Sequence, residues 1–137
     1  MPLAHYVQSL NWDVEAIVPI PLSAERFAER GYNQVALMAR PLAMIQRWHY
    51  APGALQRIKH TRSQVGLTPN ERRENVQNAF RAKAHLIRNK KILLMDDVAT
   101  TRATLTSASR ELVEAGASHV YVLTAARAIS EQKLAIA

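Results

Sequence analysis

The sequence predicts an α/β fold in which a mostly parallel central sheet is flanked by helices. Three apolar runs carry this prediction: EAIVPIPL at 15–22, KKILLM at 90–95 and HVYVLTA at 119–125. Short apolar runs rich in branched residues are typical of buried strands. Between the last two runs, residues 101–115 have helical spacing, and Gly116 follows as a common helix stop. A strand, a helix and a strand in this order form a βαβ unit, whose two strands lie parallel.

The composition is that of a globular protein, and it excludes several kinds of site. Of the 137 residues, 48 % are hydrophobic, enough for one packed domain over 1–137 with a core at about 14–128. The absence of cysteine excludes disulfides, thiolate metal sites and cysteine nucleophiles. The five histidines lie far apart, so we expect no metal held directly by the protein. No apolar run approaches the ~20 residues of a membrane span, and the first residues do not resemble a signal peptide, so we expect a cytoplasmic protein.

The charge balance favours partners that carry phosphate. Lys and Arg number 18 against 11 acidic residues, for a net charge of +7. A small nucleotide or a nucleic acid would suit such a surface. The basic residues are scattered, unlike the block that marks a nucleic-acid arm, so a merely basic soluble surface is the alternative.

The remaining segments predict shorter elements around the sheet. Helical spacing covers 23–40, with a loop over 26–33, and Pro41 should kink or restart this helix. The expected core residues of this helix and of the helix at 101–115 are Phe27, Val35, Leu37, Met38, Leu105, Ala108, Leu112 and Val113. Further along we expect a strand at 54–58, a polar loop at 59–66, a capped helix at 68–77, an edge strand at 79–82 and a short helix or frayed tail at 130–137.

An apolar stripe near Leu42, Ile45 and Trp48 continues the first helix. Such a stripe could serve a homodimer, although it is more often part of the core.

A chemically distinctive segment follows the strand at 90–95. Asp96 and Asp97 stand at the carboxyl end of that strand, where ligands bind in open parallel sheets. The Thr-rich loop 98–104 then opens a helix, and both helix N-termini and Thr hydroxyls favour a phosphate. Two carboxylates beside a phosphate pocket suit the vicinal hydroxyls of a ribose, or a magnesium ion. The alternative is that the carboxylates only end a strand and Thr101 only caps a helix, but the order of the features favours a functional site.

This segment resembles the phosphoribosyl-pyrophosphate (PRPP) motif of type I phosphoribosyltransferases, and two further stretches narrow the resemblance. Pro19-Ile20-Pro21-Leu22 with Arg26 and Arg30-Gly31-Tyr32-Asn33-Gln34 is similar to the "PVPL…R…RGfNQ" signature of the ComF family, the competence-associated phosphoribosyltransferase-like proteins. The family's "T..Q.gL…eR..Nv..aF" stretch is resembled by Thr61, Gln64, Gly66-Leu67, Glu71-Arg72, Asn75-Val76 and Ala79-Phe80. The three stretches together span about 18–127, most of the chain.

The resemblance implies a type I phosphoribosyltransferase-like fold and a role for each matched residue. Asp96 and Asp97 would hold the ribose hydroxyls as the catalytic pair. The cradle for the 5′-phosphate would be lined by Thr100, Thr101, Arg102, Ala103 and Thr104. The pyrophosphate loop would be Pro19, Ile20, Pro21 and Leu22, flanked by Arg26, Arg30 and Asn33, whose arginines would neutralise charge. A flexible flap at about 59–75 would include Gln64, Arg72 and Asn75. Tyr32 and Phe80 are interpreted as packing residues rather than base stackers.

Two departures from the family pattern matter. The family's phosphate loop usually reads TTG.T, and Arg102 stands here in place of the glycine. Glycine lets the backbone approach a phosphate closely and tolerates a positive φ, so Arg102 would either point outward or add a cation to the site. Many members also begin with a cysteine-rich, zinc-binding segment, so this chain is interpreted as a fragment or a shortened member.

Functions of different classes follow from the resemblance. The first is phosphoribosyl transfer from PRPP with Mg²⁺, a reaction that needs positioning and charge stabilisation rather than a protein nucleophile. The alternative is a catalytically degenerate module that binds a nucleotide or single-stranded DNA and acts with competence proteins in DNA uptake. A third is a degenerate fold that binds a partner protein. The sequence contains no base-recognition motif that would name the acceptor.

Overall fold

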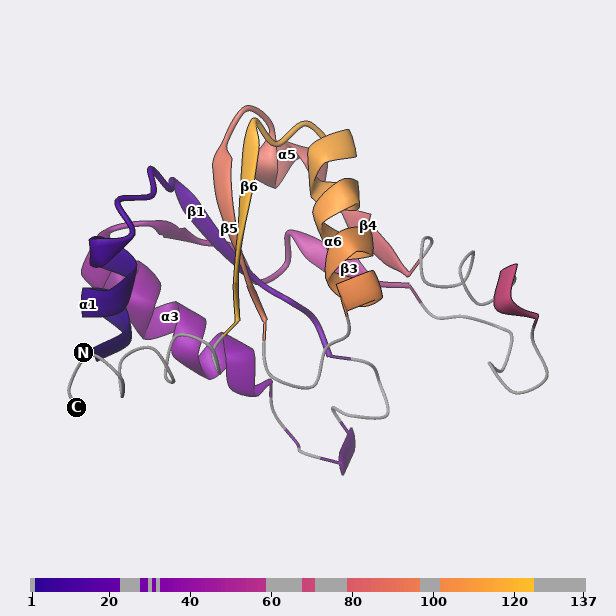
Figure 1. Cartoon of the computed structure of the whole chain (residues 1–137), viewed down its shortest axis with the longest axis horizontal. Coiled ribbons are helices and arrows are strands. Elements are labelled where there is room, and N and C mark those ends of the chain that lie inside the picture. The colour runs from indigo at the N-terminus through magenta and orange to yellow at the C-terminus, as the bar shows by residue number, and fades with distance from the viewer. Residues whose placement is uncertain are drawn as a thin grey trace.

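A parallel four-stranded sheet forms the centre of the part of the chain that the computed structural model describes, residues 2–22, 28–29, 31, 33–58, 68–70, 79–96 and 102–124 (Figure 1). The strand order is β2–β1–β5–β6, and all three pairings are parallel. These strands are β1 (Ala16–Pro19), β2 (His49–Tyr50), β5 (Lys91–Asp96) and β6 (His119–Thr124). A separate antiparallel hairpin is formed by β3 (Leu55–Arg57) and β4 (Phe80–Ala82). The helices are α1 (Pro2–Ser9), α3 (Gln34–Gln46), α5 (Ala84–Ile87) and α6 (Arg102–Glu114).

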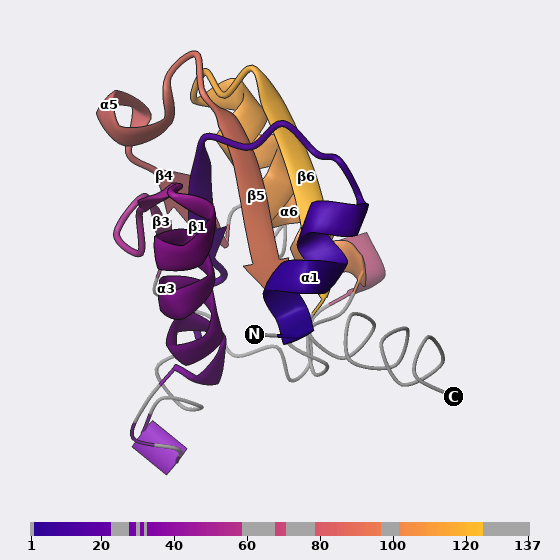
Figure 2. The ribbon, with the colours of Figure 1, turned by 90° about the vertical axis from the view of Figure 1, so that its left-hand side faces the viewer.

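Helices cover both faces of the sheet. Figures 1 and 2 show α1 and α3 on one side and α6, α5 and the β3–β4 hairpin on the other. The Gln46 side-chain amide donates to the Ala4 carbonyl (3.3 Å), which ties α3 to α1. On the opposite face the Ala82 N–H donates to a Glu111 carboxylate oxygen (3.2 Å), which ties the hairpin to α6. The predicted α/β architecture is therefore confirmed.

The two inner strands explain why the sequence reads as unbroken apolar runs. Every residue of β1 is buried, and so is every residue of β5 from Ile92 onward. A strand covered on both faces needs apolar side chains at each position rather than at alternate ones. In β6, at the end of the sheet, Leu123 is buried while Val122 is exposed, as expected where the covering layer ends.

The buried face of α3 differs from the predicted one. It consists of Val35, Ala39, Leu42 and Ala43, which repeat at helical spacing and pack on the sheet. Leu37, expected in the core, is 61 % exposed, so that prediction is wrong. Of the two outcomes expected at Pro41, a kink or a restart, the restart is wrong, because α3 continues through Pro41. Pro41 lies on the exposed side of the helix, where water can reach the carbonyl that lacks a helical donor.

The outer face of α3 also corrects the predicted apolar stripe. Leu42 is fully buried, whereas Ile45 is exposed and Trp48 is half-buried, so the three do not form one surface. The exposed large apolar side chains of α3 are Leu37, Met44 and Ile45. On α6, Ala108 and Leu112 are buried as predicted, but Val113 is 55 % exposed. Met38 and Leu105 are half-buried against the core, and Phe27 lies outside the described residues.

Three short elements were not predicted. Helix α1 contributes Leu3, Ala4 and Val7 to the core, and α5 contributes Ile87. The third is the two-residue strand β2. The predicted strand at 79–82 is present as β4, but it pairs with β3 rather than with the edge of the central sheet. None of the helices in the described part of the chain is long and apolar enough to cross a membrane.

Candidate functional site

The carboxyl ends of β1 and β5 meet at one edge of the sheet and bring two predicted site segments together. Pro19 is in register with Met95, and the Ile20 N–H donates to the Met95 carbonyl (2.8 Å), so the pairing extends one residue past β1. Asp96, the last residue of β5, therefore lies next to the start of the predicted pyrophosphate loop. This is the edge at which open parallel sheets bind ligands.

Asp96 is an unusual residue for its surroundings. Its side chain is fully buried, and among the described residues Asp96 and Ser107 are the two buried polar residues. Placing a carboxyl group in the interior costs free energy, and interactions with neighbouring groups must offset that cost. A buried carboxyl group at the edge of a sheet where ligands bind is a candidate functional group.

The loop from Pro19 to Leu22 leaves β1 partly enclosed. Pro19 and Ile20 are buried, and Pro21 and Leu22 are half-buried. Asn33, just before α3, bonds in two directions. Its side-chain oxygen accepts from the Val35 and Ala36 N–H groups (3.0 and 3.3 Å) and caps the helix, while its amide donates to the Ile20 carbonyl (3.1 Å).

Arg57, at the end of β3, is a residue of this site that the sequence analysis missed. Its Nε and Nη2 atoms both donate to the Pro21 carbonyl, at 3.3 Å each. Its guanidinium carbon lies 4.8 Å from the centroid of the Phe80 ring. Phe80 is 3 % exposed, consistent with its interpretation as a packing residue. No local pattern could identify Arg57, because its partner Pro21 lies 36 residues earlier in the chain.

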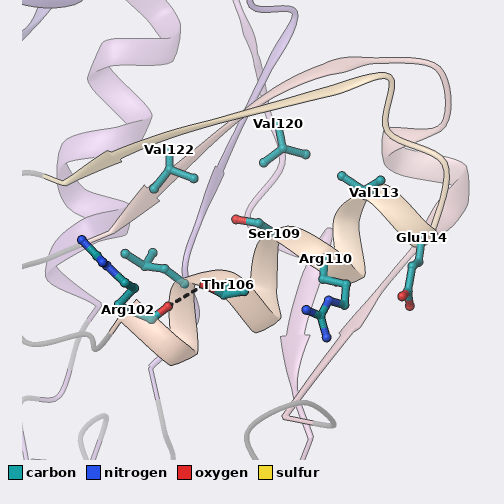
Figure 3. A pocket seen from close by; sticks show the side chains of 9 residues that line it. Arg102, Thr106, Ser109, Arg110, Val113, Glu114, Val120 and Val122 are labelled. Carbon is teal, nitrogen blue, oxygen red and sulfur yellow. Dashed lines mark hydrogen bonds between the residues drawn. The ribbon is translucent and has the colours of Figure 1, made fainter.

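The described part of the predicted phosphate cradle is the start of α6. Arg102 is its first residue and is exposed, Ala103 is exposed and Thr104 is half-buried. Arg102 is helical and is not among the described residues with positive φ, so the lost glycine causes no left-handed strain here. The Arg102 carbonyl accepts a hydrogen bond from the Thr106 hydroxyl (2.9 Å), and its side chain extends outward (Figure 3).

An open groove of about 620 Å³ runs along α6 beside β6. Its apolar wall includes Val113, Val120 and Val122, and Arg102 and Arg110 lie along it (Figure 3). Both arginines are exposed. The groove therefore offers cations beside an apolar surface, next to the start of the helix that would receive a phosphate.

Other predicted site residues lie outside the described part of the chain: Arg26, Arg30, Gln64, Arg72, Asn75, Asp97, Thr100 and Thr101. The predicted flap at 59–75 lies almost wholly outside it, as does Tyr32. Among the residues that are described, no group of three or more His, Cys, Asp or Glu could hold a metal ion.

Curated proteins similar to this chain are named for competence and DNA use. Competence protein F of Haemophilus influenzae is 38 % identical over 119 residues, 83 % of this chain and 51 % of that protein. Competence protein ComFC of Streptococcus pneumoniae is 33 % identical over 110 residues, 80 % of this chain and 47 % of that protein. The DNA utilization protein YhgH of Escherichia coli K12 is 32 % identical over 108 residues, 79 % of this chain and 47 % of that protein. This chain thus spans about half the length of these relatives.

Solved structures with a similar fold are phosphoribosyltransferase-type enzymes. The allosteric regulatory enzyme of purine biosynthesis has a TM-score of 0.60 at 17 % identity, over 90 % of this chain and 24 % of its own. Glutamine PRPP amidotransferase from B. subtilis has a TM-score of 0.59 at 18 % identity, over 90 % of this chain and 25 % of its own. At these identities the likeness shows the fold alone, and it confirms the predicted type I phosphoribosyltransferase fold. No family model matches the chain. The resemblance to the ComF family is therefore confirmed: the chain is similar over 79–83 % of its length to proteins named for competence and DNA use, and it has the type I phosphoribosyltransferase fold.

Proposed function

We propose that this chain binds PRPP or a nucleotide phosphate at the carboxyl edge of β1 and β5 and takes part in DNA uptake. The observation that carries the proposal is the buried carboxyl group of Asp96 beside the loop Pro19–Leu22. Relatives named for competence and for DNA use match this chain over about half of their own length. They support the link to DNA uptake.

Each part of this edge has a distinct role in the proposal. Asp96, with Asp97, holds the ribose hydroxyls. The loop Pro19–Leu22 receives the pyrophosphate, and the N-terminus of α6 receives the 5′-phosphate through its backbone N–H groups. In phosphoribosyl transfer the bond from the ribose anomeric carbon to pyrophosphate breaks, and a bond to the acceptor forms. Pyrophosphate leaves with the bonding electrons, so the protein's task is to hold both ends of the donor and to stabilise charge.

Mg²⁺ fits this edge as an ion that arrives with the phosphates. Magnesium in phosphate-transfer sites is usually bound by one or two carboxylates together with substrate oxygens, rather than by a cage made of protein ligands. The described residues offer the Asp96 carboxyl group and no cluster of three acidic or histidine ligands. When bound, the ion would neutralise the leaving pyrophosphate.

The test is calorimetric titration with PRPP and Mg²⁺. We expect the wild type to bind, and we expect Asp96→Asn and Asp97→Asn to weaken binding roughly tenfold or more, because each removes a charged acceptor for the ribose hydroxyls. Asp13→Asn is the matched control, since Asp13 is an exposed carboxylate away from this edge. The affinity of this variant for PRPP should stay within about twofold of that of the wild type. A wild type that binds neither PRPP nor a nucleotide would refute the proposal.

A second candidate function is a catalytically degenerate module that binds single-stranded DNA. It is favoured by Arg102 and Arg110, the two exposed cations along the groove beside β6. We expect a labelled oligo-dT to bind more weakly as salt rises, with a slope that falls by about 0.7 for each phosphate contact removed. Arg102→Gly and Arg110→Ser should each lower that slope, and a slope unchanged in both variants would exclude the groove as the DNA site.

The proposal also includes a homodimer. The outer face of α3 supplies a surface for it, because Leu37, Met44 and Ile45 are 61 %, 72 % and 48 % exposed. A patch of large exposed apolar side chains on one helix is typical of a protein–protein contact surface.

A further inference from the structure

The backbone of the loop Pro19–Leu22 is held by side chains from two separate elements. Asn33 donates to the carbonyl of Ile20, and Arg57 donates twice to the next carbonyl, that of Pro21. We propose that Arg57 is a positioning residue for the pyrophosphate end of the donor. It fixes the loop and joins it to the base of the β3–β4 hairpin. This inference rests on the proposed function of the loop.

The loop needs such outside donors because of its own sequence. Pro19 and Pro21 have no N–H group, and the Ile20 N–H is already bonded to the Met95 carbonyl (2.8 Å). Leu22 is then the one further backbone donor within the four residues. A buried or half-buried carbonyl that finds no donor is costly, and here the neighbouring backbone has few to give. The side chains of Asn33 and Arg57 meet that need.

Arg57 is held in place from its other side by Phe80. The two residues are paired in the hairpin register, and the guanidinium lies over the ring at 4.8 Å. Because Phe80 is almost fully buried, the ring is a fixed support for the cation. A planar guanidinium can stack on a ring and donate two hydrogen bonds at once, which a lysine ammonium cannot do in the same geometry.

Arg57 and Phe80 also lie at the two ends of the segment that connects β3 to β4. Arg57 ends β3 and Phe80 begins β4, so the two bracket residues 58–79, which include the predicted flap. The hydrogen bonds to Pro21 therefore connect the base of that segment to the pyrophosphate loop. They also keep one positive charge beside the loop that would receive an anion.

The two ends of the donor would bind at different places on this edge of the sheet. The pyrophosphate end lies at the loop that Arg57 holds through the Pro21 carbonyl, whereas the ribose 5-phosphate end lies at Asp96 and the start of α6. Loss of Arg57 should thus weaken the binding of pyrophosphate and PRPP but spare ribose 5-phosphate. A merely structural role would weaken all three.

The first experiment is calorimetric titration of wild type, Arg57→Ala and Arg57→Lys with Mg²⁺-pyrophosphate, PRPP and ribose 5-phosphate. We expect Arg57→Ala to lose roughly tenfold in affinity for the first two ligands and less than about twofold for the third. Arg57→Lys keeps the charge but should recover only part of the loss. Arg81→Ala is the matched control, because Arg81 is an exposed arginine one residue along β4 from Phe80. Equal losses for all three ligands, or the same loss in the control, would overturn the inference.

The second experiment does not depend on any ligand. Amide hydrogen exchange should be faster at Ile20 and Leu22 in Arg57→Ala and in Arg57→Lys, while protection in β5 is unchanged. Unchanged exchange at these two amides would show that Arg57 does not hold the loop. If the wild type bound none of the three ligands, the proposed function would fail, and the exchange data would still decide the role of Arg57.

Discussion

Asn33 joins the start of α3 to the predicted pyrophosphate loop, and its two bonding partners can be separated by substitution. Its oxygen caps the helix by accepting from Val35 and Ala36, and its amide nitrogen donates to the Ile20 carbonyl. Asn33→Ala removes both interactions. Asn33→Asp keeps an acceptor of the same shape for the cap and removes only the donor to the loop.

The expected magnitudes follow from these contacts. Loss of an N-cap side chain costs about 1 kcal/mol, and loss of a hydrogen bond to the buried Ile20 backbone costs about 1 kcal/mol more. We therefore expect Asn33→Ala to lower the free energy of unfolding by about 2 kcal/mol, or the melting temperature by roughly 6–10 °C for a domain of this size. Asn33→Asp should lose about 1 kcal/mol, reduced by a few tenths because a carboxylate suits a helix N-terminus.

Urea denaturation followed by circular dichroism would measure these changes. The dependence of the free energy of unfolding on urea concentration should be the same in all variants. Gln34→Ala is the control, since Gln34 is the adjacent, exposed first residue of α3 and should change the free energy of unfolding by less than about 0.5 kcal/mol. A loss below about 0.5 kcal/mol for Asn33→Ala would refute the reasoning. Equal losses for the alanine and aspartate variants would show that the cap contributes nothing.

Three further predictions concern other parts of the fold. Met44→Glu should leave the free energy of unfolding within about 0.5 kcal/mol of wild type and should convert a dimer to a monomer in sedimentation velocity; an unchanged sedimentation coefficient would exclude α3 as the dimer surface. Gly116→Ala should cost about 1–3 kcal/mol in thermal unfolding, because Gly116 has a φ of +113° and its added Cβ would lie 3.4 Å from the side chain of Arg88. Burial raises the pKa of the Tyr50 phenol and Arg40 lowers it in part, so Arg40→Gln should raise that pKa further in a spectrophotometric titration. Because the folded pKa lies above the unfolded one, stability should fall as pH rises past about 10.

The sequence predicts best those parts of the fold in which a single requirement, such as burial on both faces of a strand, determines the residue type at successive positions. β5 is covered on both faces from Ile92 onward, and the four apolar residues Ile92–Met95 make the run visible in the sequence. The buried faces of α3 and α6 are harder to predict, because packing against the sheet decides which side of each helix is buried. Ala39 and Ala43 lie against the sheet while Leu37 faces outward, and side-chain size alone would suggest the reverse. Helix α1 has no acidic first turn and no basic last turn, so it gave no terminal signal.

The residues of the candidate site also differ in how far the sequence could predict them. Asp96 was predictable because carboxyl ends of parallel strands share an edge, and chain order alone places it there. Arg57 was not, because a three-residue strand has no measurable period and the hydrogen-bond partner is distant in the chain. The roles of all the site residues stay predictions, and Asp97, Thr100 and Thr101 also lie outside the described part of the chain.

The two halves of the signature that suggested the family meet in one hydrogen bond, from Asn33 to the carbonyl of Ile20. The physical reason lies in the two prolines of the first half. Each proline removes a backbone donor, so carbonyls in the loop must accept from side chains elsewhere, and Asn33 in the second half supplies one such donor. Arg57 supplies the next one from the hairpin. A loop fixed in this way is ordered before any phosphate arrives, so its conformational cost falls on folding rather than on binding. The proposed phosphate site would therefore be rigid rather than one that forms around its ligand.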